Sequence, residues 1–299
     1  MDFIKTDLLL IFTMWNCIMN KQHQIASHPS TAPLHGQIQA GLPPGTILQM
    51  MYLRNQIAQL PIGTFVEVGG GNGYLTMLLM SMGWRGTTIE LDNTSAEMLK
   101  TRFAKEIDAQ QLEVVCADFL TYTSQQSVDL VISSMVIEHL PDDQESQFIT
   151  QSHRITRNGG HIIIFTPLSP AHWGIEDDIA GHMRRYTRDR LNWLLTTHQL
   201  QVVKIVGLTY PISNLLLPLS NALVRRHESA KLAVDKYQRT LESGHRDVPL
   251  KTHVPLILRL IMNEYALWPL YIIQVWCLNH QSALIGYAEA IKKEPSPEL

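Results

Sequence analysis

Residues 64–168 alternate between short, continuously apolar runs and longer segments in which apolar residues recur with helical spacing. The helical spacing predicts helices over residues 73–82, 94–107 and 142–156. Strands that are apolar throughout are buried on both faces, as in a parallel sheet. The alternation therefore predicts an α/β fold with helices on both faces of a sheet. The predicted strands are Thr64–Val68, Thr87–Leu91, Leu112–Ala117, Val128–Ser133 and His161–Thr166.

The pattern changes on both sides of this region. A Pro/His/Ser-rich stretch precedes a predicted helix over residues 45–60, and the third central helix is expected to stop at Asn158-Gly159-Gly160. After residue 168 we expect a polar loop to residue 186, a helix and a further strand. The expected division is an N-terminal cap (1–44), a core (45–210), a helical insertion (211–281), and a last strand with its tail (282–299).

Two apolar stretches raise the question of a membrane. Leu8–Trp15 has the length of a signal-peptide core, but the nearby Asp2 and the lack of a small-residue cleavage site favour an amphipathic cap helix. Pro255–Leu278 is interrupted by Arg259 and Glu264, which makes spanning a bilayer costly. No transmembrane span is expected, while peripheral membrane contact and a homodimer interface stay open.

Composition narrows the classes of partner. The chain has 299 residues, 45% of them hydrophobic, and a formal net charge of −3 with scattered basic residues, so a nucleic-acid partner is not expected. Cys17, Cys116 and Cys277 are far apart and odd in number, which fits no disulfide framework and no zinc pattern. Cys116 lies in an apolar run and is expected to be a buried thiol. The expected location is the cytoplasm, and no metal site is predicted.

A glycine-rich turn follows the first predicted strand. It reads Glu67-Val-Gly69-Gly-Gly71-Asn-Gly73 and leads directly into a helix. Glycines let the backbone turn tightly and approach a ligand, and a helix N-terminus offers free N–H groups to a nucleotide. The dinucleotide fingerprint needs a third glycine at Tyr74 or Thr76, so this turn does not match it.

With its acid at Glu67, the turn resembles the first motif of the class I S-adenosylmethionine (SAM)-dependent methyltransferases, of the bacterial small-molecule type. Later positions resemble the family in register, including Ile89-Glu90-Leu91-Asp92, Cys116-Ala117-Asp118-Phe119 and the turn at residues 157–160. By this resemblance Glu90 would bind the ribose hydroxyls, with Asp92 as the fallback, and Asp118 the adenine amino group. The implied SAM-binding residues are Glu67, Gly69, Gly71, Gly73, Glu90, Leu91, Asp92, Asp118, Phe119 and Met135.

The resemblance also implies the fold. It is a Rossmann-like, doubly wound, seven-stranded and mostly parallel sheet in the order 3-2-1-4-5-7-6. An N-terminal helical cap and a helical insertion before the last strand would be added to it. SAM would be the cofactor and S-adenosylhomocysteine (SAH) its product.

A segment after the fifth strand is the candidate for acceptor chemistry. Residues 177–187 resemble the "D…GH-x-R-R-Y-T" loop of some bacterial small-molecule methyltransferases, and His182 could remove a proton from the acceptor. His139, just after the fourth strand, is a second catalytic candidate; the alternative is that it caps the following helix. The substrate-binding candidates are Trp173, Arg184, Arg185 and Tyr186. The alternative for His182 and the arginines is to brace the loop through Asp177 or Asp178.

The expected function is O- or N-methylation of a small-molecule acceptor by in-line transfer. SAM motifs say little about the acceptor. The apolar insertion could cover an apolar or lipid-like acceptor, but core packing or a dimer interface would explain the same pattern. The alternatives are a protein or RNA methyltransferase, a SAM-binding protein without catalysis, and an NAD(P)-dependent oxidoreductase.

Overall fold

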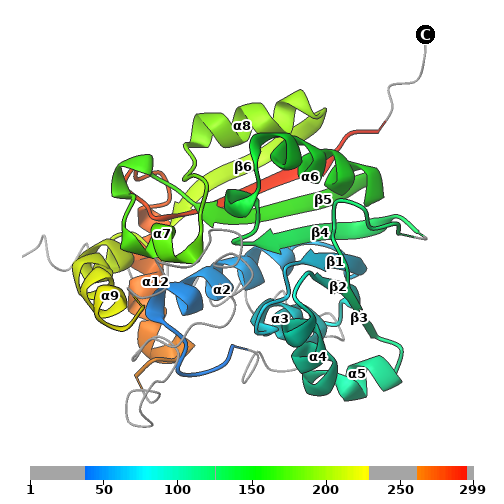
Figure 1. Cartoon of the computed structure of the whole chain (residues 1–299), viewed down its shortest axis with the longest axis horizontal. Coiled ribbons are helices and arrows are strands. Elements are labelled where there is room, and N and C mark those ends of the chain that lie inside the picture. Colours follow the sequence, from blue (N-terminus) through cyan, green and yellow to red (C-terminus); the bar gives the residue numbers. More distant parts are fainter. Residues whose placement is uncertain (1–37, 125, 229–260, 295–299) are drawn as a thin grey trace, which may run out of the picture. The chain divides into compact units, whose positions relative to one another are not determined.

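The computed structural model describes residues 38–124, 126–228 and 261–294, which form a seven-stranded sheet in the order β3-β2-β1-β4-β5-β7-β6 (Figure 1). Strand β7 is antiparallel to β5 and β6, and the other pairs are parallel. The predicted sheet order is confirmed. The strands are β1 (Thr64–Val68), β2 (Arg85–Glu90), β3 (Leu112–Cys116), β4 (Val128–Ser134), β5 (Thr156–Pro167), β6 (Leu200–Leu208) and β7 (Ile285–Lys292).

Helices cover both faces of the sheet, because successive side chains of a strand point to opposite sides. In β5, Ile162 and Ile164 pack on the side of α6 and α8, whereas Ile163 and Phe165 pack on the side of α2 and α3. The helices are α2 (Pro44–Ile57), α3 (Tyr74–Ser81), α4 (Asn93–Arg102), α5 (Ala104–Asp108), α6 (Asp142–Ile155), α7 (Ile175–Ala180), α8 (Arg188–Thr197), α9 (Ile212–Glu228) and α12 (Glu264–Trp276), with the 3-10 turns η1 (Ile137–His139) and η2 (Pro170–His172).

The glycine pair after α6 does not stop the helix, contrary to the prediction. Helix α6 ends at Ile155, and β5 already begins at Thr156. Residues 157–160 form a bulge, since the pairing of β4 with β5 shifts between Val128 and Leu130. Gly159, with φ 71°, supplies the left-handed conformation at this bulge.

Three local expectations are also corrected. The predicted polar loop over residues 169–186 contains η2 and α7, and the predicted helix over residues 94–107 is broken at the buried Phe103 into α4 and α5. Cys116 is exposed rather than buried. It is the last residue of β3, which lies at the edge of the sheet, so no further strand covers it.

The carboxyl ends of the parallel strands meet at one edge of the sheet. Val68 of β1 is paired with Ile89 of β2 and with Ser133 of β4, and Glu90 is paired with Cys116 of β3. The loops after these strands therefore lie next to one another. β1 and β4 flank the point where the strand order reverses, which is where α/β sheets bind ligands.

Several predicted segments lie outside the described residues. These are the cap helix at Leu8–Trp15, most of the Pro/His/Ser-rich stretch, and residues 229–260 of the insertion. The described parts of the insertion are α9 and α12, and α12 packs along α2 through the Arg54–Glu264 ion pair at 2.5 Å. Within the described ranges, none of the helices combines the length and apolar character needed to cross a bilayer.

The buried carboxylate of Glu145 joins α6 to the first turn of α8 and to the segment before it. It accepts hydrogen bonds from Tyr186 Oη at 2.6 Å, Arg184 Nη1 at 3.1 Å and Arg190 Nη2 at 2.5 Å. Its side chain is 1% exposed. Because Tyr186 is completely buried as well, a lost partner cannot be replaced fully by water.

Glu145→Ala should therefore lower the free energy of unfolding by about 2–3 kcal/mol, since it removes the shared acceptor of a buried hydroxyl and two guanidinium groups. The matched control is Asp143→Ala, which removes an exposed acid from the same helix. Urea unfolding followed by circular dichroism measures both variants. Equal losses of stability in the two would contradict the assigned role of Glu145.

Candidate functional site

Glu67 lies under the glycine turn and is 1% exposed. Its Oε2 accepts hydrogen bonds from Thr76 Oγ1 at 2.5 Å and Thr88 Oγ1 at 3.2 Å, which tie β1 to α3 and β2. Burial raises the pKa of Glu67 to about 8 in spite of these hydrogen bonds. Glu67, which was predicted to bind the cofactor, is therefore buried and connects the elements on either side of the glycine turn.

The glycine turn adopts conformations that other residues rarely take. Gly69, Gly71 and Gly73 have φ 77°, 49° and 74°. A Cβ at Gly69 would lie 2.6 Å from Val136 Cγ2, so the close approach of the β4 loop requires glycine there. A Cβ at Gly71 would meet no atom within 4 Å, so the backbone at Gly71 borders open space.

The carboxylate of Glu90 fixes the other side of this space. Its Oε2 accepts the N–H of Gly71 at 2.8 Å, and its Oε1 accepts the N–H groups of Leu91 at 2.9 Å and Asp92 at 3.2 Å. Glu90 is only partly buried. The side chain is thus held at the carboxyl end of β2 while it stays accessible to a ligand.

Of the other predicted cofactor residues, Asp92 and Phe119 have partners within the fold, whereas the side chains of Leu91 and Asp118 are exposed. Asp92 is the N-cap of α4 and accepts the N–H of Ser95 at 2.7 Å, so its carboxylate already has a structural partner. Phe119 is 5% exposed and packs on Phe148. Leu91 is 50% exposed, and Asp118 is exposed with Oδ1 bound to the N–H of Leu120 at 2.9 Å.

A cavity of about 570 Å³ lies beside this edge of the sheet. Met135 and His139, which follow β4, line it together with α7, α9 and the start of α2. Met135 has φ 57°, an unusual conformation for a residue with a side chain, and such strain is often found at functional sites. Besides Met135, the apolar part of the lining comes from Pro43, Pro44, Pro167, Ala180, Leu216, Leu217, Leu219, Leu223, Met262, Leu284 and Ile285.

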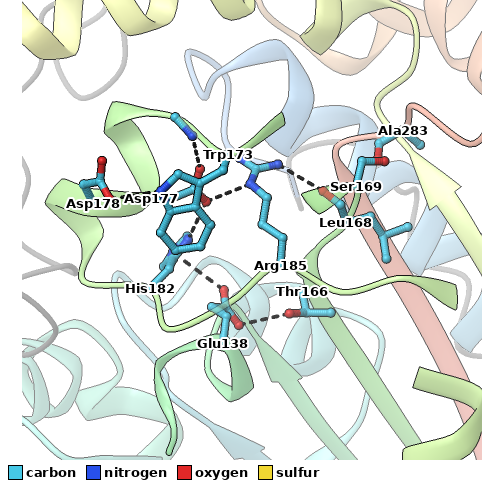
Figure 2. Close-up of polar contacts among 11 residues, drawn as sticks. Glu138, Thr166, Leu168, Ser169, Trp173, Asp177, Asp178, His182, Arg185 and Ala283 are labelled. Carbon is cyan, nitrogen blue, oxygen red and sulfur yellow. Dashed lines mark hydrogen bonds and ion pairs between the residues drawn. The ribbon is translucent and has the colours of Figure 1, made fainter. Parts of the chain in front are cut away.

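Asp177 on α7 organises the polar end of the cavity (Figure 2). Its Oδ1 binds His182 Nδ1 and Arg185 Nε, each at 2.8 Å, and its Oδ2 accepts the N–H of Gly174 at 2.8 Å. Burial alone would raise the pKa of Asp177, but the hydrogen bonds from His182 and Arg185 hold it below its usual value. Asp177 is therefore a carboxylate, which accepts a hydrogen from Nδ1 of His182.

The ring of His182 is enclosed on its other side by η1. His139 packs against it with ring centroids 4.8 Å apart, and Oε1 of the fully buried Glu138 lies 3.9 Å from His182 Nε2. Burial raises the pKa of Glu138 to about 7, while the charges of His182 act to lower it. Neither Asp177 nor Glu138 was assigned a catalytic role from the sequence. Only the fold brings η1 against the segment after α7.

The predicted substrate-binding residues have structural partners. Arg185 is 8% exposed and also donates to the carbonyl of Leu168 at 3.1 Å. Arg184 binds Glu145 and Asp142, and Tyr186 is completely buried with its hydroxyl on Glu145. Arg185 and His182 contact Asp177, which agrees with the alternative that these residues stabilise the loop. Arg184 pairs with Asp142 and Glu145 instead of Asp177 or Asp178. Trp173 is 41% exposed, with Nε1 on Asp178 Oδ1 at 3.0 Å.

The central part of the chain is similar to known protein sequences. Residues 66–164 match the family described as a methyltransferase domain. An uncharacterized methyltransferase of Bacillus mycoides (strain KBAB4) is 28% identical over 101 residues, which are 34% of this chain and 45% of that protein. One of Bacillus cereus (strain 03BB102) matches with the same values. The chain thus spans less than half the length of these curated relatives.

Solved structures agree on the fold. Phosphoethanolamine N-methyltransferase 2 of Haemonchus contortus, solved in complex with SAM, aligns with a TM-score of 0.51 and 14% identity, over 82% of this chain and 52% of that one. A putative sarcosine dimethylglycine methyltransferase of Galdieria sulphuraria aligns with a TM-score of 0.50 and 12% identity, over 82% of this chain and 85% of that one. At these identities the likeness is one of fold alone.

Glu67→Gln should change how stability depends on pH. The folded state holds a proton on Glu67 up to about pH 8, whereas the unfolded chain releases it near 4.5. The wild type therefore loses stability as pH rises through this window, at up to about 1.4 kcal/mol per pH unit. The neutral glutamine has no such loss. In urea unfolding, the free energy of unfolding of the variant should therefore rise relative to that of the wild type between pH 5 and pH 8.

Glu113→Gln is the matched control, because Glu113 is an exposed acid on β3. Its stability should follow the wild type at every pH. If the curves of Glu67→Gln and the wild type ran parallel from pH 5 to pH 8, Glu67 would be ionised in the folded protein.

Proposed function

We propose that this chain, a class I SAM-dependent methyltransferase by its fold and by the domain that residues 66–164 match, methylates a small-molecule acceptor with an apolar body. The observation that carries the proposal is the cavity beside the carboxyl ends of β4 and β5, with an apolar lining and a histidine–carboxylate pair at its polar end.

The residues at the glycine turn fit an adenosyl ligand. Gly71 leaves open space where a Cβ would stand, and Glu90 presents a fixed carboxylate beside it. Each carboxylate oxygen accepts more than one hydrogen bond, so the backbone bond to Oε2 leaves capacity for a ribose hydroxyl. The exposed side chain of Leu91 offers an apolar contact for the adenine ring of such a ligand. These residues would hold SAM, which supplies a methyl carbon activated by a positively charged sulfur.

The task of the protein is then to align the acceptor and to take up its proton. Asp177 holds the proton of His182 on Nδ1, so the neutral ring has its lone pair on Nε2. We assign His182 as the general base for an acceptor hydroxyl or amine. His139 and Met135 lie between this group and the end of β4, and they would position the acceptor in the cavity.

The apolar lining favours an acceptor with an aromatic or aliphatic body. Helix α9 lines the cavity with Leu216, Leu217 and Leu223, and Ser213 and Ser220 are its polar contributions. Burying apolar surface favours binding, by about 25 cal/mol per Å² before the entropy cost of association is subtracted. Because Asp177 already pairs with Arg185, that guanidinium is not left over for an anionic acceptor.

The proposal is tested with the full-length protein in two steps. Calorimetry should detect binding of SAM and SAH but not of NADPH. Incubation with methyl-labelled SAM and a panel of phenols, alkyl amines and hydroxylated lipids should then yield a labelled product and SAH. His182→Ala should lower kcat about 10²–10⁴-fold and leave the Kd for SAH unchanged, because the ring removes a proton and does not bind the cofactor.

His198→Ala, which removes the histidine at the C-cap of α8, is the control and should turn over normally, because His198 does not line the cavity. Failure of the wild type to bind either sulfur ligand would overturn the proposed function. Normal turnover by His182→Ala would overturn only the assignment of the base.

The shape of the cavity gives a second prediction. Leu217→Trp places a larger side chain in the lining and should raise the KM for the acceptor at least about tenfold, while SAH binding stays the same. Leu215→Trp is the matched variant, since Leu215 lies on the same helix but is 79% exposed and is not part of the lining. A similar KM in both variants would mean that the acceptor binds elsewhere.

A further inference from the structure

We infer that the buried carboxylate of Glu138 is a positioning residue of the transfer: it faces Nε2 of His182 and stabilises the imidazolium that forms when the acceptor's proton moves to that nitrogen. The inference rests on the proposed function, because it needs His182 to act as the base. It assigns a role to an acid that the sequence motifs left without one.

Glu138 lies close enough to His182 for an electrostatic attraction but too far away for a hydrogen bond. The residue is completely buried, and its Oε2 accepts a hydrogen bond from Thr166 Oγ1 at 3.2 Å (Figure 2). Its Oε1 accepts no hydrogen bond from any residue that the structure describes, and lies 3.9 Å from His182 Nε2. This separation is too long for a hydrogen bond, but two opposite charges attract strongly over it in a buried site.

The direction of proton transfer follows from the hydrogen bond on the other side of the ring. Since Asp177 accepts a hydrogen from Nδ1, the incoming proton binds Nε2. The bond between the acceptor atom and its hydrogen breaks, the Nε2–H bond forms, and the acceptor atom keeps the electron pair, which makes it the nucleophile. The cationic ring then lies between two carboxylates.

The charges around the ring show why two carboxylates are present. From α7, Asp177 faces the ring and Glu176 lines the same cavity; from η1 come Glu138 and His139. Arg185 binds Asp177 and balances its charge. Glu138 is therefore the remaining partner for the imidazolium.

The protonation of Glu138 supports this role. Burial raises the pKa of Glu138 to about 7, and the charge of His182 lowers it. The ionised form of Glu138 is therefore present at neutral pH, where its charge can attract the cationic ring. An apolar residue or a permanently neutral one could not do so.

The experiment is a titration of the His182 ring by NMR in the SAH-bound protein, for the wild type, Glu138→Gln and Glu138→Asp. Glu138→Gln keeps the shape but loses the charge, so the pH at which the ring protonates should fall below that of the wild type. Glu138→Asp keeps the charge and should stay close to the wild type. The acid limb of the pH profile of kcat/KM should move in the same way.

An unchanged ring titration in Glu138→Gln would overturn the inference, and so would equal shifts in the glutamine and aspartate variants, which would indicate a packing effect. If Glu138→Gln does not fold, Thr166→Val takes its place. This variant removes a hydrogen bond that favours the ionised form of Glu138. The pH at which the His182 ring protonates should therefore fall in Thr166→Val too, by less than is expected for Glu138→Gln. Transfer that stops with EDTA and returns with Mg²⁺ would also overturn it, since Glu138, His139 and His182 each have a ligand atom within 4.8 Å of the others. Because the titration needs no turnover, it is independent of whether an acceptor is found.

Discussion

The carboxylate of Asp177 accepts three hydrogen bonds, and each one fixes a different part of the segment between β5 and α8. The N–H of Gly174 starts α7, Nε of Arg185 secures the return of the chain, and Nδ1 of His182 sets the ring and its tautomer. A carboxylate that is 1% exposed is stable only when such donors surround it. The same contacts that stabilise the segment therefore also orient the histidine that we propose as the general base.

The two halves of the site are brought together by the parallel sheet. The glycine turn after β1 and Glu90 at the end of β2 form the half proposed to hold an adenosyl group, and the segment after β5 lines the cavity proposed for the acceptor. The loop after β4 lies between them, with Met135 in a left-handed conformation and His139 against His182. Methyl transfer needs both reactants in contact and in line, and the proposed sites at neighbouring strand ends would meet that need.

The sequence predicts the parts of the fold that depend on local pattern. The limits of β1 and the sheet order are confirmed, because the apolar runs and the family resemblance both reflect the central sheet. Helix α7 was missed, since six residues rich in acids show no helical periodicity. The exposure of Cys116 depends on β3 being an edge strand, which no local pattern reveals.

The site was predicted with the same limits. His182 and the glycine turn were identified as candidates, because their motifs are continuous in sequence. Glu138 was not, because its neighbour His182 is far away along the chain. The roles of Tyr186 and Arg184 could not be separated from that of His182 by motif alone, and only the contacts with Glu145 distinguish them.

The most direct measurement is a long-range ¹H–¹⁵N NMR spectrum of the histidine rings in the SAH-bound protein, at a pH where His182 is neutral. Nδ1 of His182 should carry the hydrogen, and Nε2 should be the nitrogen with the free lone pair. A neutral ring with its hydrogen on Nε2 would contradict the proposed role of His182, because Nε2 could not then accept the acceptor's proton.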